Sequence, residues 1–270
     1  MYAQGLTPNP CVECNRSVKF DHFINQAKKL NCDKVATGHY AKIIKNNDKY
    51  ELHKADYLDK DQSYVLHMLK SSDLENITFP LGEISKPDVR QIAARIGLKT
   101  AFKKDSQDIC FVGKKDYRSF VEKRIDLTSP GEIFDTEGNK VGDHNGIHEF
   151  TVGQRKGLPG GYGSPRYVTK INVQNKNVTI GERNDLLVSS FIVEELSCVN
   201  DLEYKNLTIQ TRYNSEDLPC EIKKLSDTKV LVQLKEPAFG VAPGQFGVIY
   251  NGTKVVCGGR ISPKVLENVG

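Results

Sequence analysis

The sequence lacks the features of a membrane protein and of a secreted disulfide-rich protein. It contains no run approaching the ~18 apolar residues of a membrane span. Met1 is followed by Tyr-Ala-Gln-Gly-Leu-Thr-Pro, which has neither the basic region nor the apolar run of a signal peptide. Seven cysteines is an odd number for a disulfide framework. We therefore expect a cytoplasmic protein, without membrane association, whose cysteines are reduced thiols.

The composition is that of a folded protein, and its charge is unevenly distributed. Of the 270 residues, 38% are hydrophobic and 27% are charged, which suits two domains or three small ones. The first 125 residues hold 22 basic and 16 acidic side chains, whereas the rest hold 16 and 18. The basic excess, densest over 99–124, favours a polyanionic partner such as nucleic acid. A solvated lysine-rich surface is the alternative.

The beginning of the chain has the pattern of an α/β unit. Residues 1–17 are expected to form a loop, because Thr-Pro-Asn-Pro favours extended backbone. Apolar residues then recur at helical spacing over 18–30. A short buried-type strand over 32–37 ends at Gly38. A helix that leads into a strand ending at a glycine turn is typical of an α/β domain.

A second helix is marked by its ends. Ser85 is placed as its N-cap, Pro87 fits its first turn and Gly97 is placed as its stop. Between them an apolar stripe recurs at helical spacing, made of Val89, Ile92, Ala93 and Ile96.

The composition changes near 127–131, and strand patterns follow. Two hairpins are expected, one over 131–141 and one from 167–173 to 177–181. Further short strand patterns recur at a spacing typical of a small antiparallel barrel: 191–196, 207–213, 220–225, 230–234, 246–250 and 255–261. The sequence thus predicts an α/β part at 1–126, a small β-rich part at 127–188 and a β-barrel at 189–270.

Three cysteines are candidates for chemistry. Cys11 and Cys14 form a CxxC, but no second CxxC and no nearby HxxxH exist to complete a zinc site. A nucleophilic thiol near a helix N-terminus is favoured instead, with small buried side chains as the alternative. Cys110 follows a pair of lysines that favour its thiolate. The three thiols therefore suit either a two-thiol pair or an iron–sulfur cluster with one open site.

Other polar segments have two interpretations each. Gly38 and His39 follow a strand, where ligands gather in α/β sheets. Lys60-Asp61-Gln62 suits a phosphate contact, or a helix start with Asp61 as cap. The Gly-flanked basic turn over 153–157 suits a phosphate contact or a tight surface loop. Spacing alone does not decide between these.

Taken together, these segments resemble the tRNA-specific 2-thiouridylases over nearly the whole chain, from about Gly5 to Ile261. The resemblance rests on motifs in the order known for that family: 7–15 (TPNPCVECN), 37–40 (TGHY), 60–64 (KDQSY), 105–111 (DSQDICF), 153–157 (GQRKG) and 211–213 (TRY).

The resemblance implies a fold and a reaction. The fold is α/β, a partial nucleotide-binding domain of the ATP-pyrophosphatase type, followed by a small β-rich central domain that binds tRNA and a C-terminal antiparallel β-barrel. The reaction replaces the C2 oxygen of the wobble uridine of tRNA by sulfur. ATP, with Mg²⁺, activates the oxygen as an adenylate, and a cysteine persulfide supplies the sulfur. A persulfide carrier or a cysteine desulfurase is the implied donor protein.

The resemblance also assigns roles to residues. Cys14 matches the nucleophile and Cys110 the persulfide carrier, while the backbone of Gly38 matches an ATP contact. The remaining matches are tRNA contacts, with the first three lying against the target base: Asn9, Pro10, Cys11, His39, Lys60, Asp61, Gln62, Arg212, Tyr213 and Gln245.

The sequence departs from the family pattern in two places. Cys11 stands where the family often has an aspartate, which puts an acid/base role there in doubt and adds a third thiol. No Ser-Gly-Gly-Val-Asp-Ser phosphate loop occurs in residues 1–40. The sequence is therefore expected to be a fragment, or a gene product read from an internal Met, which the coding DNA upstream of Met1 would reveal.

Three hypotheses follow: a disulfide-forming thiolase, an iron–sulfur-dependent thiolase with Cys11, Cys14 and Cys110 as ligands, and a catalytically inert tRNA-binding remnant. Anaerobic reconstitution with visible absorbance separates the first two.

The absence of the phosphate loop gives the first prediction. The chain is expected to bind ATP weakly and not to thiolate tRNA, because phosphate binding in this fold needs backbone N–H groups from a Gly-rich turn. Weak tRNA binding should persist and should fall with salt, because basic side chains supply it. Titration with ATP, and with tRNA at two salt concentrations, tests both parts. Micromolar ATP affinity, or salt-independent tRNA binding, would contradict them.

Overall fold

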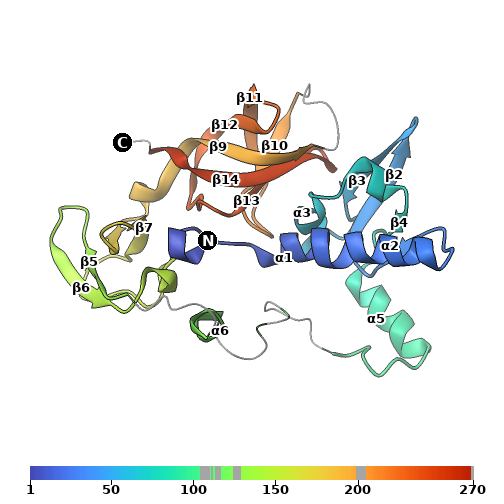
Figure 1. The fold of residues 1–270 in the computed structure, drawn as a ribbon, viewed down its shortest axis with the longest axis horizontal. Helices are drawn as coiled ribbons and strands as arrows, with labels where there is room; N and C mark the ends of the chain where they lie inside the picture. The colour runs from blue at the N-terminus through green and yellow to red at the C-terminus, as the bar shows by residue number, and fades with distance from the viewer. Residues whose placement is uncertain (104–109, 111, 113–116, 124–128, 199–204, 269–270) are drawn as a thin grey trace.

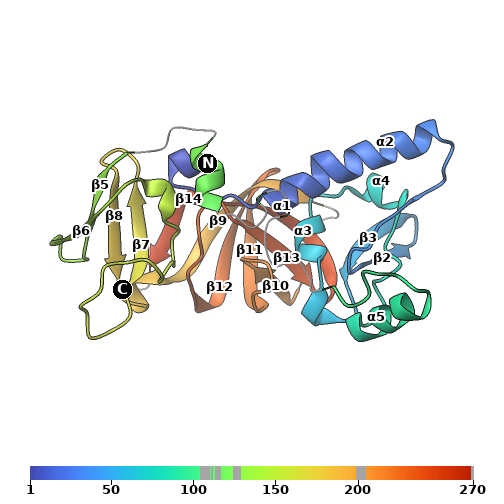
Figure 2. The ribbon, with the colours of Figure 1, turned by 90° about the horizontal axis from the view of Figure 1, so that it is seen from below.

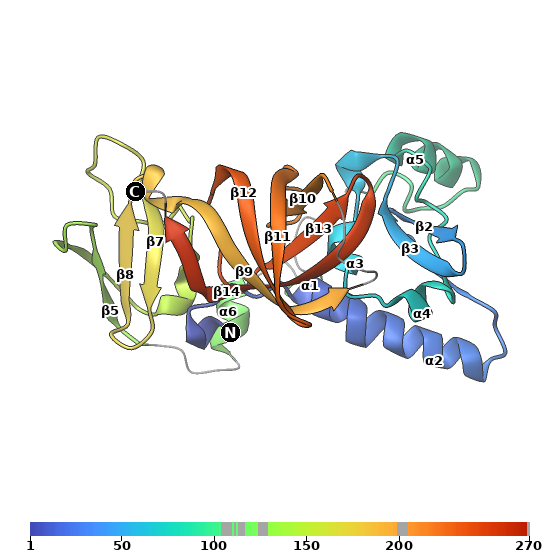
Figure 3. The same cartoon turned by 90° about the horizontal axis from the view of Figure 1, so that it is seen from above.

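The computed structural model describes residues 1–103, 110, 112, 117–123, 129–198 and 205–268. The elements lie in a row, with a β-barrel in the middle (Figure 3). The helices and strands from residue 21 to residue 95 lie at one end of the row, and a small sheet lies at the other (Figure 2). The C-terminal barrel is thus the part against which both others are placed.

The C-terminal part is a closed antiparallel barrel, as predicted. Its six strands follow in the order β13-β10-β11-β12-β9-β14, and pairing of β13 with β14 closes the cylinder. The strands are β9 (Leu187–Cys198), β10 (Leu207–Gln210), β11 (Leu218–Ser226), β12 (Lys229–Phe239), β13 (Phe246–Asn251) and β14 (Lys254–Asn268). Alternating apolar side chains such as Phe191 and Val193 fill the interior, where both are fully buried.

The expected loop over 1–17 is wrong, because a helix begins at Pro10. Asn9 is its N-cap in extended conformation, and Pro10 occupies the first turn. Helical segments α1 (Pro10–Glu13), η2 (Cys14–Phe20, a π-helix) and α2 (Asp21–Lys29) run on without a break (Figure 1). Proline at this position is favourable, since its missing N–H would have no partner in the helix. Cys11 and Cys14 therefore lie in the first turns of a helix.

The α/β pairing near Gly38 is shorter than predicted. Strand β1 (Val35–Ala36) pairs in parallel with β4 (Ile77–Thr78), two residues each. Sequence analysis missed the hairpin β2 (Ala41–Asn46) and β3 (Lys49–Lys54), whose β3 pairs with β14 of the barrel. Its many lysines hid the strand pattern. Lys54 of β3 is buried, and its charge is compensated because its Nζ lies 2.6 Å from the Asp217 carboxylate.

Short helices connect these strands: η3 (Leu58–Lys60), α3 (Ser63–Leu66) and α4 (Ser71–Leu74). The predicted second helix is confirmed as α5 (Lys86–Arg95), with the Ser85 hydroxyl accepting from the Asp88 N–H at 3.3 Å and Gly97 at φ +76° beyond its end. Its apolar stripe is exposed, however, with Ile92 42% and Ile96 65% accessible.

The small sheet confirms the two predicted hairpins. Strands β5 (Gly131–Phe134), β6 (Lys140–His144), β7 (Tyr167–Asn172) and β8 (Asn177–Gly181) follow in the order β6-β5-β8-β7, with β5 and β8 parallel. The remaining described helices are η1 (Tyr2–Gln4), α6 (Tyr117–Glu122), η4 (Ile147–Glu149) and η5 (Asn184–Leu186). The helix η1 packs against η4, so the N-terminus contacts the small sheet's region.

Among the helices of the described ranges, none has the length and apolar character that a membrane crossing requires.

A buried histidine joins the first part of the chain to the barrel. His67, directly after α3, has no exposed surface and its ring centroid lies 5.0 Å from that of Phe246. A Cβ on Gly258 of β14 would lie 2.3 Å from His67 Cδ2, so only glycine leaves room for this ring. Nδ1 of His67 lies 2.7 Å from the Tyr64 carbonyl oxygen. Burial lowers the pKa of His67 to about 4, so the ring is neutral at pH 7.

Acid should therefore destabilise this joint. The unfolded histidine takes up its proton near pKa 6.5, whereas the folded one does so at about 4. The contribution of the neutral His67 to the free energy of unfolding is thus fully present above pH 6.5 and is lost as pH decreases toward 4. Between about pH 7.5 and about pH 5, the free energy of unfolding of the His67→Gln variant should therefore fall by about 2 kcal/mol less than that of the unaltered chain. Urea unfolding at the two pH values measures the difference.

His22→Gln, at an exposed site, is the matched control and should leave the pH dependence unchanged. His39, whose pKa is also about 4, keeps its own contribution in both variants. Equal pH dependence in His67→Gln and the unaltered chain would contradict the interpretation.

Candidate functional site

The predicted motif segments that the structure describes are linked to one another beside the barrel. The segment before the first helix lies on the loop between β12 and β13, where the Thr7 N–H donates to the Pro243 carbonyl at 3.1 Å. Gln245 Nε2 donates back to the Thr7 carbonyl at 3.4 Å. Gly244, at φ +88°, makes this approach possible, because a Cβ there would lie 2.9 Å from Leu6 Cβ and from Thr7 N. The proposed tRNA contact Gln245 thus also holds the N-terminal segment.

The first helical turns are held on both sides of the two cysteines. The Asn9 side chain hydrogen-bonds to Tyr64, whose hydroxyl donates to the Phe246 carbonyl at 2.9 Å. Asn15, only 3% exposed, donates from Nδ2 to the Val65 carbonyl at 3.1 Å. Tyr64 therefore connects three segments, a role that its place in the KDQSY motif did not reveal to sequence analysis.

Electrostatics places the three candidate thiols near one another. Protein atoms around the Cys11 thiol desolvate it in part and raise its pKa, although the residue keeps an exposed surface. The Cys110 thiolate raises this pKa further and Cys14 does so by a smaller amount, while Lys19 opposes them. Cys11 and Cys110 are exposed and Cys14 is half-buried, so all are open to a reactant. The direct approach of Cys14 to Cys110 stays a prediction. Six described cysteines are free thiols: Cys11, Cys14, Cys32, Cys110, Cys220 and Cys257.

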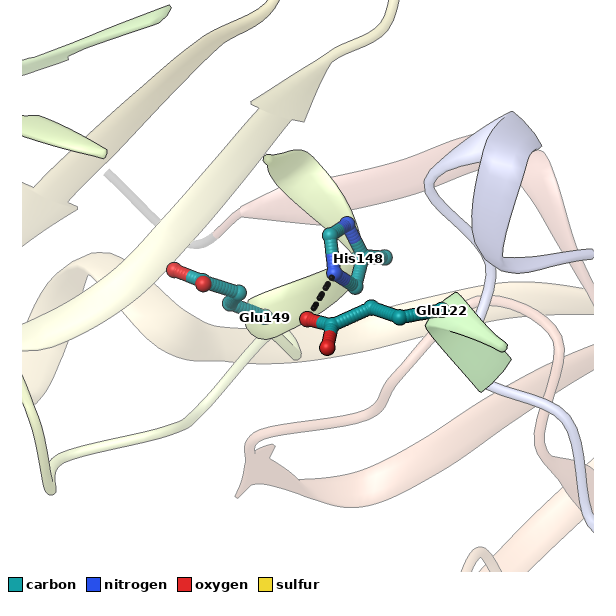
Figure 4. A group of neighbouring side chains, drawn as sticks. All are labelled: Glu122, His148 and Glu149. Atoms are coloured by element: carbon teal, nitrogen blue, oxygen red, sulfur yellow. Dashed lines mark hydrogen bonds and ion pairs between the residues drawn. The ribbon is translucent and has the colours of Figure 1, made fainter. Parts of the chain in front are cut away.

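Helix α6, which follows Cys110 in the sequence, contacts the region of the small sheet. The neighbours of Cys110 at 105–109 and Phe111 lie outside the described residues. At the end of α6, Glu122 Oε1 lies 3.1 Å from His148 Nε2 of η4 (Figure 4). One donor atom each of Glu122, His148 and Glu149 lies within 4.8 Å of the others, a set of the kind that divalent cations accept. His148 is 3% exposed, so this contact anchors α6 on a buried side chain.

Asp61 has its carboxylate turned toward the protein. It accepts from the Ala55 N–H at 2.8 Å and from the Ser63 hydroxyl at 2.6 Å. Burial raises its pKa, and these hydrogen bonds oppose the shift. The alternative interpretation of Asp61 as the cap of a solvated helix start is wrong, because Asp61 is buried and Gln62 is the N-cap of α3, while the tRNA contact of Asp61 stays a prediction. Gln62 accepts from the Tyr40 N–H at 3.0 Å and so joins this motif to TGHY.

Gly38 and His39 follow the parallel strand β1. Gly38 is exposed, and a Cβ there would meet only Leu81 Cδ1, at 3.6 Å, so its backbone is open to a ligand such as ATP. His39 is 9% exposed and its ring lies 5.7 Å from that of Phe20. Burial, aided by Lys19, lowers the pKa of His39 to about 4. His39 thus presents a neutral ring beside the proposed ATP edge.

Arg212 brings two more motifs together. Its guanidinium donates to the Gly240 carbonyl, and a Cβ on Gly153 would lie 3.0 Å from its Nη2. The basic turn 153–157 therefore lies beside 211–213, with Arg155 and Lys156 exposed. Tyr213 is 42% exposed, and its ring centroid lies 6.2 Å from that of Tyr64. Exposed cations and an aromatic ring at one place suit contact with nucleic acid.

Three family models match the chain in succession. They are the tRNA methyl transferase HUP domain at residues 1–114, the tRNA methyl transferase PRC-barrel domain at 118–182 and the Aminomethyltransferase beta-barrel domain at 188–261.

Curated relatives match nearly the whole chain. A protein of Chloroflexus aurantiacus named tRNA-specific 2-thiouridylase MnmA is 43% identical over 266 residues, which is 97% of this chain and 74% of that protein. Proteins of the same name from Lachnoclostridium phytofermentans and Rickettsia prowazekii are each 40% identical, over 96% and 98% of this chain and 74% and 75% of their own lengths.

The proximity of the thiols has a direct test. Cys110→Ser should lower the pKa of Cys11 toward that of an ordinary cysteine, because a neighbouring thiolate is removed. Cys14→Ser should act in the same direction by a smaller amount. The rate of Cys11 alkylation as a function of pH, read by peptide mass spectrometry, gives the midpoint. Cys32→Ser is the control. An unchanged midpoint in Cys110→Ser would show that the two thiols are far apart.

Proposed function

The chain belongs to the tRNA-specific 2-thiouridylase family, and on that premise we propose that its site serves ATP-dependent transfer of sulfur to C2 of the wobble uridine of tRNA, in an enzyme that also supplies the phosphate loop that residues 1–40 lack. The observation that carries the proposal is the convergence of the motif segments. The described motif residues of 7–15, 37–40, 60–64, 153–157 and 211–213 are linked by hydrogen bonds and close contacts around the first turns of one helix. Cys11 and Cys14 lie in those turns, and Cys11 is within electrostatic reach of Cys110.

The proposed chemistry uses Cys110 and Cys14 in sequence. The uridine O2 is activated by ATP as an adenylate with release of pyrophosphate, at a site to which the Gly38 backbone contributes one edge. The terminal sulfur of a Cys110 persulfide attacks C2, and AMP leaves with the oxygen. The Cys14 thiolate then attacks Cys110 Sγ and breaks the S–S bond. The electron pair stays on the sulfur now bound to C2, and the Cys14–Cys110 disulfide is reduced by an external thiol.

The persulfide must be renewed, so the proposed function includes a sulfur-donor protein, either a persulfide carrier or a cysteine desulfurase. Mg²⁺ would accompany ATP. We place the reaction in the cytoplasm, and we propose 1–126, 127–188 and 189–270 as the catalytic, central tRNA-binding and barrel domains.

The proposed tRNA surface surrounds these thiols. Asn9, Pro10 and Cys11 are assigned to the target base, and His39 to the neighbouring tRNA. Positive charge for phosphates comes from the exposed basic turn and from Lys60, and Tyr213 offers a ring for stacking. The remaining proposed contacts are Asp61, Gln62, Arg212 and Gln245.

An iron–sulfur cluster on Cys11, Cys14 and Cys110 is the second candidate. The proximity of these thiols favours it, since three thiolates suit a cluster that keeps one site open. Bound there, a cluster would supply an iron at which sulfur is held before transfer.

Separate replacement of the two thiols tests the first candidate. Cys14→Ser and Cys110→Ser should each abolish thiolation in the complete enzyme, because serine supplies no thiolate for sulfur exchange. The Kd for tRNA should change by less than about twofold, because phosphate contacts dominate affinity. Mass spectrometry of the digested tRNA and filter binding measure the two effects.

Cys32→Ser, at an exposed cysteine outside the site, is the control and should keep full thiolation. Thiolation that persists in Cys14→Ser or Cys110→Ser would contradict the assigned roles.

A further inference from the structure

A charged contact connects the barrel to the residue directly before Cys14. Arg260 of β14 places Nη2 3.2 Å from Oε1 of Glu13, although 247 positions separate the two residues. The Arg260 side chain is 15% exposed, whereas that of Glu13 is 38% exposed. A contact with one partner so well covered is less screened by solvent than an ordinary surface ion pair.

Arg260 is itself fixed by the barrel and does not depend on Glu13 for its place. Its guanidinium lies 4.9 Å from the centroid of the Phe246 ring. Nη1 donates to the Gly244 carbonyl at 3.3 Å, and Nε donates to Glu195 Oε2 at 3.3 Å. The planar guanidinium is thus held in one orientation before it meets the helix.

Glu13 is held from two directions. Its Oε1 faces Arg260, while its Oε2 lies 2.9 Å from Arg16 Nη2, one turn further along the helix. Hydrogen bonds at Thr7 and Asn15 fix the ends of this segment. The Arg260 contact adds a constraint between them, at the residue that precedes Cys14, and so restricts rotation of these turns about the helix axis.

We propose that Arg260 is a positioning residue for Cys14, acting through Glu13 to set the direction of the Cys14 thiol toward Cys110. The proposal rests on the proposed function, in which these two thiols form a disulfide. Glu13 belongs to the 7–15 motif segment, whereas Arg260 lies outside the motif segments that support that function.

The experiment compares variants in two measurements. The first is the equilibrium between the Cys14–Cys110 disulfide and the two thiols in a glutathione redox buffer, read by peptide mass spectrometry. It depends on the alignment of the thiols and requires no turnover. The second is kcat and KM for tRNA thiolation in the complete enzyme.

Arg260→Gln and Glu13→Gln should each lower the disulfide equilibrium constant and kcat by about tenfold, with KM for tRNA unchanged, because a misdirected thiol loses effective concentration. The double variant should lose no more than either single one, since both remove the same contact. Arg260→Lys, which retains the charge without the planar fork, should recover part of the loss.

Glu194→Gln is the matched control, because it removes a carboxylate of the same strand that pairs with Lys229 and not with Arg260, and it should behave like the unaltered enzyme. Additive losses in the double variant, or an unchanged disulfide equilibrium in Arg260→Gln, would overturn the proposal. A Cys14–Cys110 disulfide that fails to form even in the unaltered enzyme would instead contradict the proposed function.

Discussion

The close approach of the N-terminal segment to Gly244 is the constraint on which the site depends. Two backbones can lie this near one another only where no Cβ stands between them, and the Thr7–Pro243 hydrogen bond then fixes their alignment. That bond determines where the helix beginning at Pro10 starts, and therefore where Cys11 and Cys14 lie. The contacts of Asn9, Glu13 and Asn15 follow from the same alignment.

The joint between the helical part and the barrel is made of buried polar groups that are kept neutral or paired. His67 is neutral because burial lowers its pKa to about 4, and it fits only against Gly258. Lys54 is buried as well, but its charge meets the Asp217 carboxylate. Burial of either group without its neutral form or its partner would be costly. Each group therefore stabilises one arrangement of the helical part on the barrel over other arrangements.

The sequence predicted most of what depends on local pattern. Strand spacing revealed the six-stranded barrel and both hairpins of the small sheet, and Ser85 and Gly97 marked α5. The helix at Pro10 was missed because Pro-Asn-Pro suits both a loop and a helix start. The hydrogen bond of Asn9 to Tyr64, a distant residue, favours the helix start and is not visible in the sequence. The hairpin β2–β3 was missed because its lysines interrupt the apolar pattern, and the one that is buried, Lys54, is paired with the distant carboxylate of Asp217. The motif residues came from resemblance, whereas the Glu13–Arg260 pair has no signal in a single sequence.

The proposed tRNA contacts and the proposed catalytic thiols of the site have different structural requirements. Basic and aromatic groups such as Arg155 and Tyr213 are exposed, so they can meet a flexible polyanion over a wide surface. The proposed chemistry is different, because sulfur exchange needs two thiols aligned to within bonding distance. Cys14 gains that precision from a helix start fastened at several points to a rigid barrel. Helix α6, which follows Cys110 in the sequence, is held at a different place, by the contact of Glu122 with His148. The proposed sulfur exchange therefore requires thiols from two parts of the chain to be aligned.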